Sequence, residues 1–246
     1  MKKILIIILL LMSVMKSSAI ASVNMTGNST VKCGRISDYV FEDGQSNIIC
    51  ANRNAGKRVA LTFDDGPGSK YTEEILQILS LYNIKATFFV VGNNVEKNPD
   101  ILKMIYDNGH EIGNHTYSHP DMRKISAEQI DDEIIKTQKI IKEITGEAPA
   151  LFRPPGGYLN NIIVDRITAN NCKAVLWSWR QDTMDWKCPE AETIVSTVIS
   201  NIHDGDIILF HDLISGNSPT PCALKKIIPK LMDMGYEFVT VSMLVS

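Results

Sequence analysis

Apolar positions along the chain form two alternating patterns, short apolar runs and longer segments with helical spacing. Short apolar runs bounded by polar or turn residues predict buried strands, and apolar residues three and four apart predict amphipathic helices. The predicted strands are Val59–Phe63, Ala86–Val91, Glu111–Asn114, Leu151–Arg153, Lys173–Ser178, Asp206–Phe210 and Tyr236–Val241. The predicted helices are Tyr71–Leu81, Pro99–Asn108, Ser126–Thr145, Asn160–Asn170, Pro189–Ile202 and Pro221–Met234.

Strand and helix therefore alternate through most of the chain. Parallel strands need a crossover connection, usually a helix, so this order predicts an α/β fold with about seven parallel strands. Closed around one core, such units would form a (β/α) barrel, and an open sheet is the alternative. In both architectures the reactive side chains are expected at the carboxyl ends of the strands.

The first residues follow neither pattern. Met1-Lys2-Lys3 precedes an aliphatic run, and Ala19-Ile20-Ala21 has the small-x-small form of a signal peptidase site. Residues 1–21 are therefore predicted to be a cleaved secretory signal, with an uncleaved amino-terminal anchor as the alternative. Residues 22–57 are polar and are interpreted as a lead-in, and residues 58–246 as the main domain. No stable membrane span is expected after signal cleavage, because no later segment is apolar for long enough.

Charge and cysteine content bear on the partners and the disulfides of the protein. The formal net charge of -3 offers no basic surface, so no nucleic-acid partner is expected. Export would allow disulfides, but sequence alone leaves the pairing open, as it does the oligomeric state. The five cysteines are Cys33, Cys50, Cys172, Cys188 and Cys222; Cys33 and Cys50 could close the amino-terminal segment on itself.

Candidate metal ligands follow two of the predicted strands. Asp64 and Asp65 end the first strand, and His115 and His119 lie four residues apart after the third. Residues four apart share a face of a helical turn, so both imidazoles are expected on one side. Two histidines and one carboxylate suit Zn²⁺ and leave positions open for water and substrate. We therefore predict a divalent metal, Zn²⁺ first and Co²⁺ or another ion as alternatives, on Asp65, His115 and His119. The alternative is that these histidines only hydrogen-bond within their loops, which we also expect of His110 and His203.

Asp64 is then available as a general base, because a metal ion acidifies a water molecule and a neighbouring carboxylate can take its proton. The permanently charged Arg153 would hold that carboxylate ionised and oriented, unless it forms only a surface ion pair. Arg153 precedes Pro154-Pro155-Gly156-Gly157, a loop whose exposed N–H groups, notably that of Tyr158, could meet a developing oxyanion.

His211 ends the sixth predicted strand and is a candidate general acid for protonating a leaving amine. Asp185 could hold His211 and raise its pKa by its opposite charge, whereas Asp182 is interpreted as a loop cap. Trp186, Leu209 and Tyr158 would supply apolar and stacking walls for substrate, although each of them could equally be ordinary core.

The assembled pattern resembles the polysaccharide deacetylase family, carbohydrate esterase family 4, with its NodB-homology domain. Five ordered motifs carry the resemblance, which extends from about Val59 to Val241. They are Thr-Phe-Asp-Asp-Gly-Pro at Thr62–Pro67, His-Thr-x-x-His-Pro at His115–Pro120, Arg-Pro-Pro-Gly-Gly-Tyr at Arg153–Tyr158, Asp-x-x-Asp-Trp at Asp182–Trp186 and Ile-Leu-Phe-His-Asp at Ile208–Asp212. The third departs from the family at Gly156, where many members have Tyr or Arg, and a less crowded rim is expected there.

The resemblance implies a distorted (β/α) barrel and metal-dependent removal of acetyl groups from N-acetylated sugars. By the same resemblance, Arg153 orients Asp64, Asp185 tunes His211, and Leu209 with Trp186 shapes the acetyl pocket. With export, the expected substrate is a polysaccharide that contains N-acetylglucosamine, either peptidoglycan or a chitin-like glycan. The expected location is secreted, periplasmic or cell-wall-associated. Two alternatives stay open, an O-deacetylase acting on a glycan such as acetylxylan and a non-catalytic glycan-binding module.

Overall fold

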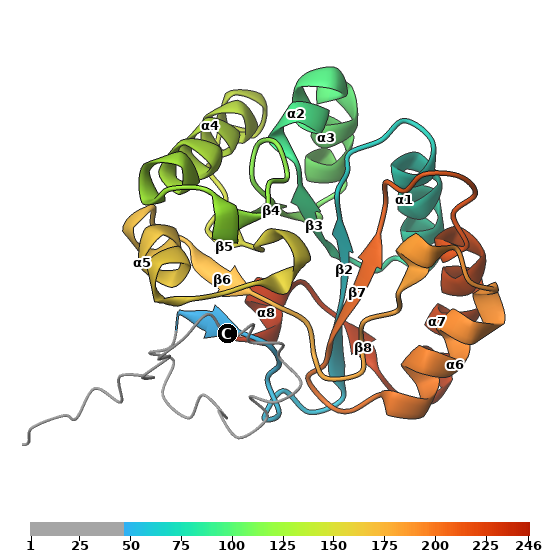
Figure 1. Ribbon diagram of the computed structural model, residues 1–246. Coiled ribbons are helices and arrows are strands. Elements are labelled where there is room, and N and C mark those ends of the chain that lie inside the picture. The colour runs from blue at the N-terminus through green and yellow to red at the C-terminus, as the bar shows by residue number, and fades with distance from the viewer. Residues whose placement is uncertain (1–46) are drawn as a thin grey trace, which may run out of the picture.

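The computed structural model describes residues 47–246. The predicted signal at residues 1–21, Cys33 and most of the lead-in at residues 22–57 lie outside the described residues. Within residues 47–246 the helices lie around the strands (Figure 1). The strands are β1 (Ile48–Ile49), β2 (Arg58–Asp64), β3 (Thr87–Val90), β4 (Glu111–Asn114), β5 (Leu151–Phe152), β6 (Lys173–Val175), β7 (Ile207–His211) and β8 (Glu237–Phe238). The helices are α1 (Tyr71–Leu81), α2 (Gly92–Lys97), α3 (Pro99–Asp107), α4 (Ala127–Thr145), α5 (Asn161–Ala169), α6 (Ala191–Asn201), α7 (Thr220–Asp233) and α8 (Val241–Leu244).

All the paired strands run parallel, in the order β1-β6-β5-β4-β3-β2-β7, with β8 beside the start of β2. The sheet curves into a half-barrel whose open side lies between its edge strands, β1 and β7. Irregular chain after β6 lines that side, because Ser178 N–H donates to the Ile207 carbonyl and Leu209 N–H donates to the Gln181 carbonyl, each at 2.9 Å. The predicted α/β fold, a distorted barrel of about seven parallel strands, is confirmed.

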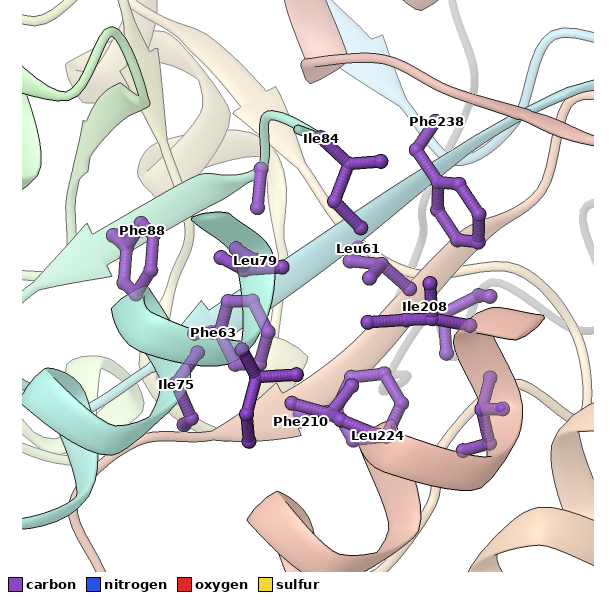
Figure 2. Packing of buried hydrophobic residues seen from close by; sticks show 14 of the residues in the cluster. Leu61, Phe63, Ile75, Leu79, Ile84, Phe88, Ile208, Phe210, Leu224 and Phe238 are labelled. Carbon is purple, nitrogen blue, oxygen red and sulfur yellow. The ribbon is translucent and has the colours of Figure 1, made fainter. Parts of the chain in front are cut away.

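The two faces of the central strands have different surroundings. Val59, Leu61 and Phe63 of β2 point outward, where helices cover them, so these side chains are fully buried. The Phe63 ring stacks on those of Phe88 and Phe210, with centroids 4.9 and 5.7 Å apart (Figure 2). Because side chains alternate along a strand, the intervening residues of β2 face the barrel interior. The inward face is therefore the one on which polar groups of a site can gather.

Helix α4 shows how local sequence sets an element's ends. Ser126 forms a capping box with Gln129, and Gly146 ends the helix with a left-handed φ of 87°. A stripe of buried residues, Ile130, Ile134 and Ile141 among them, faces the sheet. The predicted helix at residues 126–145 is confirmed apart from its capping residue.

Four segments differ from the sequence prediction. Helix α2 was not predicted, because it is six residues long, largely polar, and follows β3 directly. The last predicted strand, Tyr236–Val241, is wrong beyond residue 238, since Thr240 caps the short helix α8. Strand β6 ends at Val175 rather than at residue 178, where the chain leaves β5 and crosses to β7. Residues 48–49, expected to be irregular, pair with β6 as β1.

Two further observations concern the cysteines and the membrane. Cys50 is disulfide-bonded, whereas Cys172, Cys188 and Cys222 are free thiols. Within residues 47–246, no helix combines the length and the apolar character needed to cross a bilayer.

Candidate active site

Four of the predicted site residues face the barrel interior at the carboxyl ends of neighbouring strands. Asp64 ends β2 and pairs in register with His211 at the end of β7. His115 directly follows β4, and Arg153 directly follows β5. The alternation that sends Phe63 and Phe210 into the outer core therefore sends Asp64 and His211 inward. Strand pairing thus brings together side chains that lie up to 147 residues apart in sequence.

Asp65, His115 and His119 form a cluster with the spacing of a metal site. The Asp65 Oδ1 atom lies 3.4 Å from His115 Nε2 and 3.2 Å from His119 Nε2. Their potential ligand atoms all lie within 4.8 Å of one another. The two imidazole rings meet edge to face, with centroids 5.0 Å apart. One carboxylate and two imidazoles therefore converge on a single point.

The two histidines do not share a helical turn, and that expectation is wrong. Residues 115–119 form a loop in which Thr116 and His119 have left-handed φ values of 68° and 57°. The loop turns sharply after β4 because the Asn114 side chain accepts a hydrogen bond from Thr116 N–H at 2.9 Å. The convergence of the imidazoles therefore comes from this turn rather than from helical periodicity.

A hydrogen bond fixes the orientation of the buried His115 ring. His115 Nδ1 donates to the Arg153 carbonyl oxygen at 2.7 Å, since a carbonyl only accepts. Its Nε2 atom points toward Asp65, 3.4 Å from Oδ1. Such a bond on the far nitrogen is the usual support of a metal-binding histidine.

Asp65 supplies an independent test of whether these residues fit a cation. Its Oδ1 atom is buried and has no hydrogen-bond partner among the described residues. Burial raises the pKa of Asp65, but the imidazoles of His115 and His119 outweigh burial and hold that pKa well below its usual range. A buried, ionised oxygen without a hydrogen bond calls for a positive partner, and the N and O donors here suit a divalent metal.

Asp64 and Arg153 form a fully buried ion pair beside this cluster. Arg153 Nη1 lies 2.7 Å from Asp64 Oδ1 and 2.8 Å from Thr62 Oγ1. The remaining guanidinium nitrogens donate to the carbonyls of Val175 and Leu176. The alternative of a surface ion pair for Arg153 is therefore excluded by its burial. The guanidinium fixes one carboxylate oxygen of Asp64 and leaves Oδ2 directed toward His115, 3.8 Å from its Nε2.

Replacing Arg153 with Met should destabilise the fold strongly. It would leave Asp64 charged and buried without its partner, which typically costs about 3–5 kcal/mol. Arg166→Met is a matched control, because Arg166 pairs with Asp131 at 3.3 Å in a partly exposed position. That pair should contribute at most about 1 kcal/mol. Guanidinium chloride unfolding measures both variants, and similar losses in the two would contradict the role given to the buried pair.

His211 and Asp185 form a second buried acid–base pair on the other side of Asp64. His211 Nδ1 donates to Asp185 Oδ1 at 2.7 Å, and the other carboxylate oxygen accepts the His211 backbone N–H at 2.8 Å. Burial lowers the pKa of His211, but the hydrogen bond and charge of Asp185 outweigh it and raise that pKa to about 9. His211 is therefore an imidazolium at neutral pH, and its Nε2 proton is available.

The three predicted wall residues have different surroundings. Leu209 is buried on β7, two residues before His211, whereas the Trp186 side chain is about half exposed. The Tyr158 ring lies over Gly156, where an added Cβ would be 2.7 Å from its Cε2 atom. The guanidinium of Arg123 lies 3.6 Å from the centroid of the same ring. The Tyr158 ring therefore packs against Gly156, and the less crowded rim expected there stays a prediction.

Several supporting residues were not found from the sequence. Thr62 binds the Arg153 guanidinium, and Thr220 donates to Asp185 Oδ2. Asp212 accepts bonds from Gly66 N–H at 2.9 Å and Thr72 Oγ at 2.6 Å, which hold the loop that carries Asp65. The position of Thr62, two residues before Asp64 on one strand face, was a usable signal. The other contacts join distant segments and left no local pattern.

Beside the cluster lies an open groove of about 480 Å³. Asp65 and His119 line it together with Asn93, Ser118 and Leu213. The groove gives the cluster access from solvent, which a site for a large substrate requires. His110 and Asp182 lie outside this arrangement: His110 Nδ1 accepts Ala86 N–H, and Asp182 caps Met184 N–H. Both have the local roles predicted for them.

Known proteins that are similar to this chain match it along most of its length. The family model described as polysaccharide deacetylase matches residues 51–175. A peptidoglycan-N-acetylglucosamine deacetylase from Bacillus cereus is 44% identical over 189 residues, which cover 77% of this chain and 88% of that protein. A solved peptidoglycan N-acetylglucosamine deacetylase, in complex with an N-oxidanyl-benzamide, has a TM-score of 0.76 and 41% identity over 80% of this chain and 91% of that one.

Two further solved structures show the range of these relatives. A family 4 acetyl xylan esterase from Clostridium thermocellum, in complex with a cobalt ion, has a TM-score of 0.72 and 39% identity, covering 76% of this chain and 90% of that one. A pseudoenzyme of carbohydrate esterase family 4 from Bacillus anthracis has a TM-score of 0.75 and 34% identity, covering 81% of this chain and 69% of that one. Sequence and fold agree over most of residues 47–246, and the chain belongs to the polysaccharide deacetylase family.

Proposed function

We propose that this polysaccharide deacetylase is a metal-dependent amidase that removes acetyl groups from N-acetylglucosamine units, with peptidoglycan as the leading substrate. The observation that carries the proposal is Asp65 Oδ1, buried without a hydrogen bond and facing two imidazole nitrogens. A proton acceptor, Asp64, and a proton donor, His211, lie next to it on paired strands. The Bacillus cereus relative supports the choice of glycan.

Asp65, His115 and His119 are the proposed ligands of a divalent ion. Zn²⁺ suits this set best, and Co²⁺ is compatible with the same donors. When bound, the ion supplies Lewis-acid activation of water and of the acetyl carbonyl. Three protein ligands leave coordination positions open, as a catalytic site requires and a structural site does not.

Asp64 is the proposed general base. As water attacks the acetyl carbonyl carbon, Asp64 accepts the water proton, and a C–O bond forms. The Arg153 guanidinium, 2.7 Å away, holds the carboxylate in place and favours its ionised form. We also propose that the backbone N–H of Tyr158 faces the oxygen that gains negative charge during this step.

His211 is the proposed general acid. When the C–N bond breaks, the sugar nitrogen takes the proton of His211 Nε2, and acetate and a free amine result. The raised pKa of about 9 keeps His211 charged at neutral pH, so the donor is ready before substrate arrives. Leu209 and Trp186 are the proposed walls of the acetyl pocket beside it.

The pH profile of kcat/KM should report His211. Activity requires the imidazolium, so it is expected to fall as pH rises through the His211 pKa of about 9. Asp185→Asn removes the charge that raises this pKa, and should move the alkaline limb to lower pH, toward the usual histidine value of about 6.5. An alkaline limb at the same pH in both proteins would contradict the pairing of these residues in the mechanism.

An acetate-release screen tests the proposed activity. Zinc-loaded protein would be incubated separately with peptidoglycan, chitin oligomers and acetylxylan, and released acetate measured. We expect acetate from the N-acetylated glycans, with peptidoglycan the best substrate. The acetyl xylan esterase relative supports a second candidate, an O-deacetylase, because an alkoxide leaves more readily than an amine and the same residues would serve. Release from acetylxylan alone would favour that candidate.

The pseudoenzyme relative keeps a non-catalytic glycan-binding module as the third candidate. No acetate from any glycan, although zinc is bound, would favour it. Peptidoglycan lies outside the cytoplasmic membrane, so the proposed location is secreted, periplasmic or cell-wall-associated. The amino-terminal residues 1–21 are the proposed export signal.

A further inference from the structure

Glu133, on helix α4, accepts hydrogen bonds from the loop that carries the two proposed histidine ligands. Its Oε2 atom accepts the backbone N–H groups of Tyr117 and Ser118, each at 2.7 Å. Its Oε1 atom accepts the Ser118 hydroxyl at 2.7 Å. One half-buried carboxylate therefore receives three hydrogen bonds from two successive loop residues, immediately before His119.

The conformation of this loop explains why such support matters. Thr116 and His119 both have left-handed φ values, which residues with a Cβ adopt only at an energetic cost. Bonds within the loop, such as His119 N–H to Thr116 Oγ1 at 3.0 Å, do not tie it to the rest of the fold. Glu133 does, because α4 is anchored on the sheet through its buried isoleucines. The N–H groups of Gly92 and Asn93 on α2 also donate to the Thr116 and Tyr117 carbonyls, each at 2.9 Å. Of these contacts, those of Glu133 are the ones made by a side chain, to the two residues directly before His119.

The two imidazoles are supported differently. His115 is buried at the end of β4 and held by the Arg153 carbonyl. The His119 side chain is 44% exposed, and its ring nitrogen Nε2 contacts Asp65. His119 therefore depends on its loop for its position, whereas His115 depends on the sheet.

We infer that Glu133 is a positioning residue for the metal site: its carboxylate holds residues 117–118 so that His119 stays beside Asp65. The inference rests on the proposed function only for the metal, not for the substrate. A carboxylate suits the task because charge-assisted hydrogen bonds are about twice as strong as neutral ones. A glutamine would keep one acceptor oxygen but turn an NH₂ group toward donors.

Zinc affinity of metal-stripped protein tests the inference. The dissociation constant would be measured by competition with a chromophoric chelator for wild type, Glu133→Gln and Glu133→Ala. Loss of a residue that orients a metal ligand typically weakens metal binding by about 10–100-fold, and that is the expected change. Glu143→Gln is the matched control on the same helix, since Glu143 is 63% exposed and lies 3.9 Å from Lys139. Its zinc affinity should stay within about twofold of wild type, as for an exposed pair.

A purely structural role for Glu133 would give a different pattern. It would lower the melting temperature of the metal-free variants and leave their zinc affinity unchanged, which would overturn the inference. The visible spectrum of cobalt-loaded protein adds a second readout, because a displaced His119 should change the coordination and so the absorption bands. An unchanged spectrum together with unchanged affinity in Glu133→Gln would also overturn it.

The test separates this inference from the proposed activity. A wild-type protein that binds no zinc would contradict both the role of Glu133 and the proposed metal-dependent activity. Wild-type binding with a weakened Glu133→Gln variant supports the inference even if no glycan yields acetate. Wild-type binding and acetate release, with full zinc affinity in Glu133→Gln, would remove the inference alone.

Discussion

Asp64→Asn is expected to lower kcat for acetate release by roughly 10²–10⁴-fold, the usual contribution of a general base. Asparagine has nearly the same shape and still offers an oxygen to Arg153 Nη1, but it cannot accept the water proton. Zinc binding should persist, because the proposed ligands are Asp65, His115 and His119. Steady-state kinetics of the zinc-loaded variant, with its metal content measured, checks the effect.

Loss of a buried charge could itself disturb the fold, so the experiment needs a matched control. Asp206 is fully buried directly before β7 and pairs with Arg53 at 2.6 Å. It lies at the opposite end of the same strand from His211. Asp206→Asn should lose stability while its kcat stays close to that of wild type. Asp64→Asn with a kcat within tenfold of wild type would remove Asp64 from the mechanism.

His115→Ala should abolish both zinc binding and acetate release. It removes a proposed ligand that is buried and oriented through Nδ1. Zinc affinity should fall by more than about 100-fold, the upper end of the loss caused by removing an outer partner of a ligand. Acetate release should then fall to the background of a reaction without protein.

His203→Ala is the control for this variant. The His203 side chain is 71% exposed, is not among the groove residues, and places its Nδ1 atom 2.8 Å from the Asn201 carbonyl oxygen at the end of α6. Its replacement should leave zinc affinity and activity unchanged. Wild-type zinc affinity in His115→Ala would contradict the proposal that His115 is a metal ligand.

The fold was predictable because its signals are local. Apolar runs such as Ala86–Val91 and helical stripes such as that of α4 need no knowledge of distant residues, and their alternation sets the parallel sheet. Elements that rest on longer contacts were missed or displaced. Strand β1 exists only through its pairing with β6, and β6 is short because the following chain bonds to β7.

The candidate site was predictable where its residues lie at the ends of strands. Asp64, Arg153 and His211 follow from strand ends and from parallel order, which places such ends on one rim. The geometry of His119 did not follow, since spacing suggested a helical turn whereas two left-handed residues form a loop. The roles of Glu133 and Asp212 were not predicted, although Asp212 lies within the last motif, because each accepts backbone N–H groups of a loop in another part of the fold.

Acetate release from peptidoglycan by metal-stripped protein, titrated with zinc, tests the central claim most directly. The account predicts no acetate without metal, and activity that rises with added zinc and saturates near one equivalent per chain. Full acetate release from metal-stripped protein would contradict it, as would zinc bound at one equivalent without any acetate from any acetylated glycan.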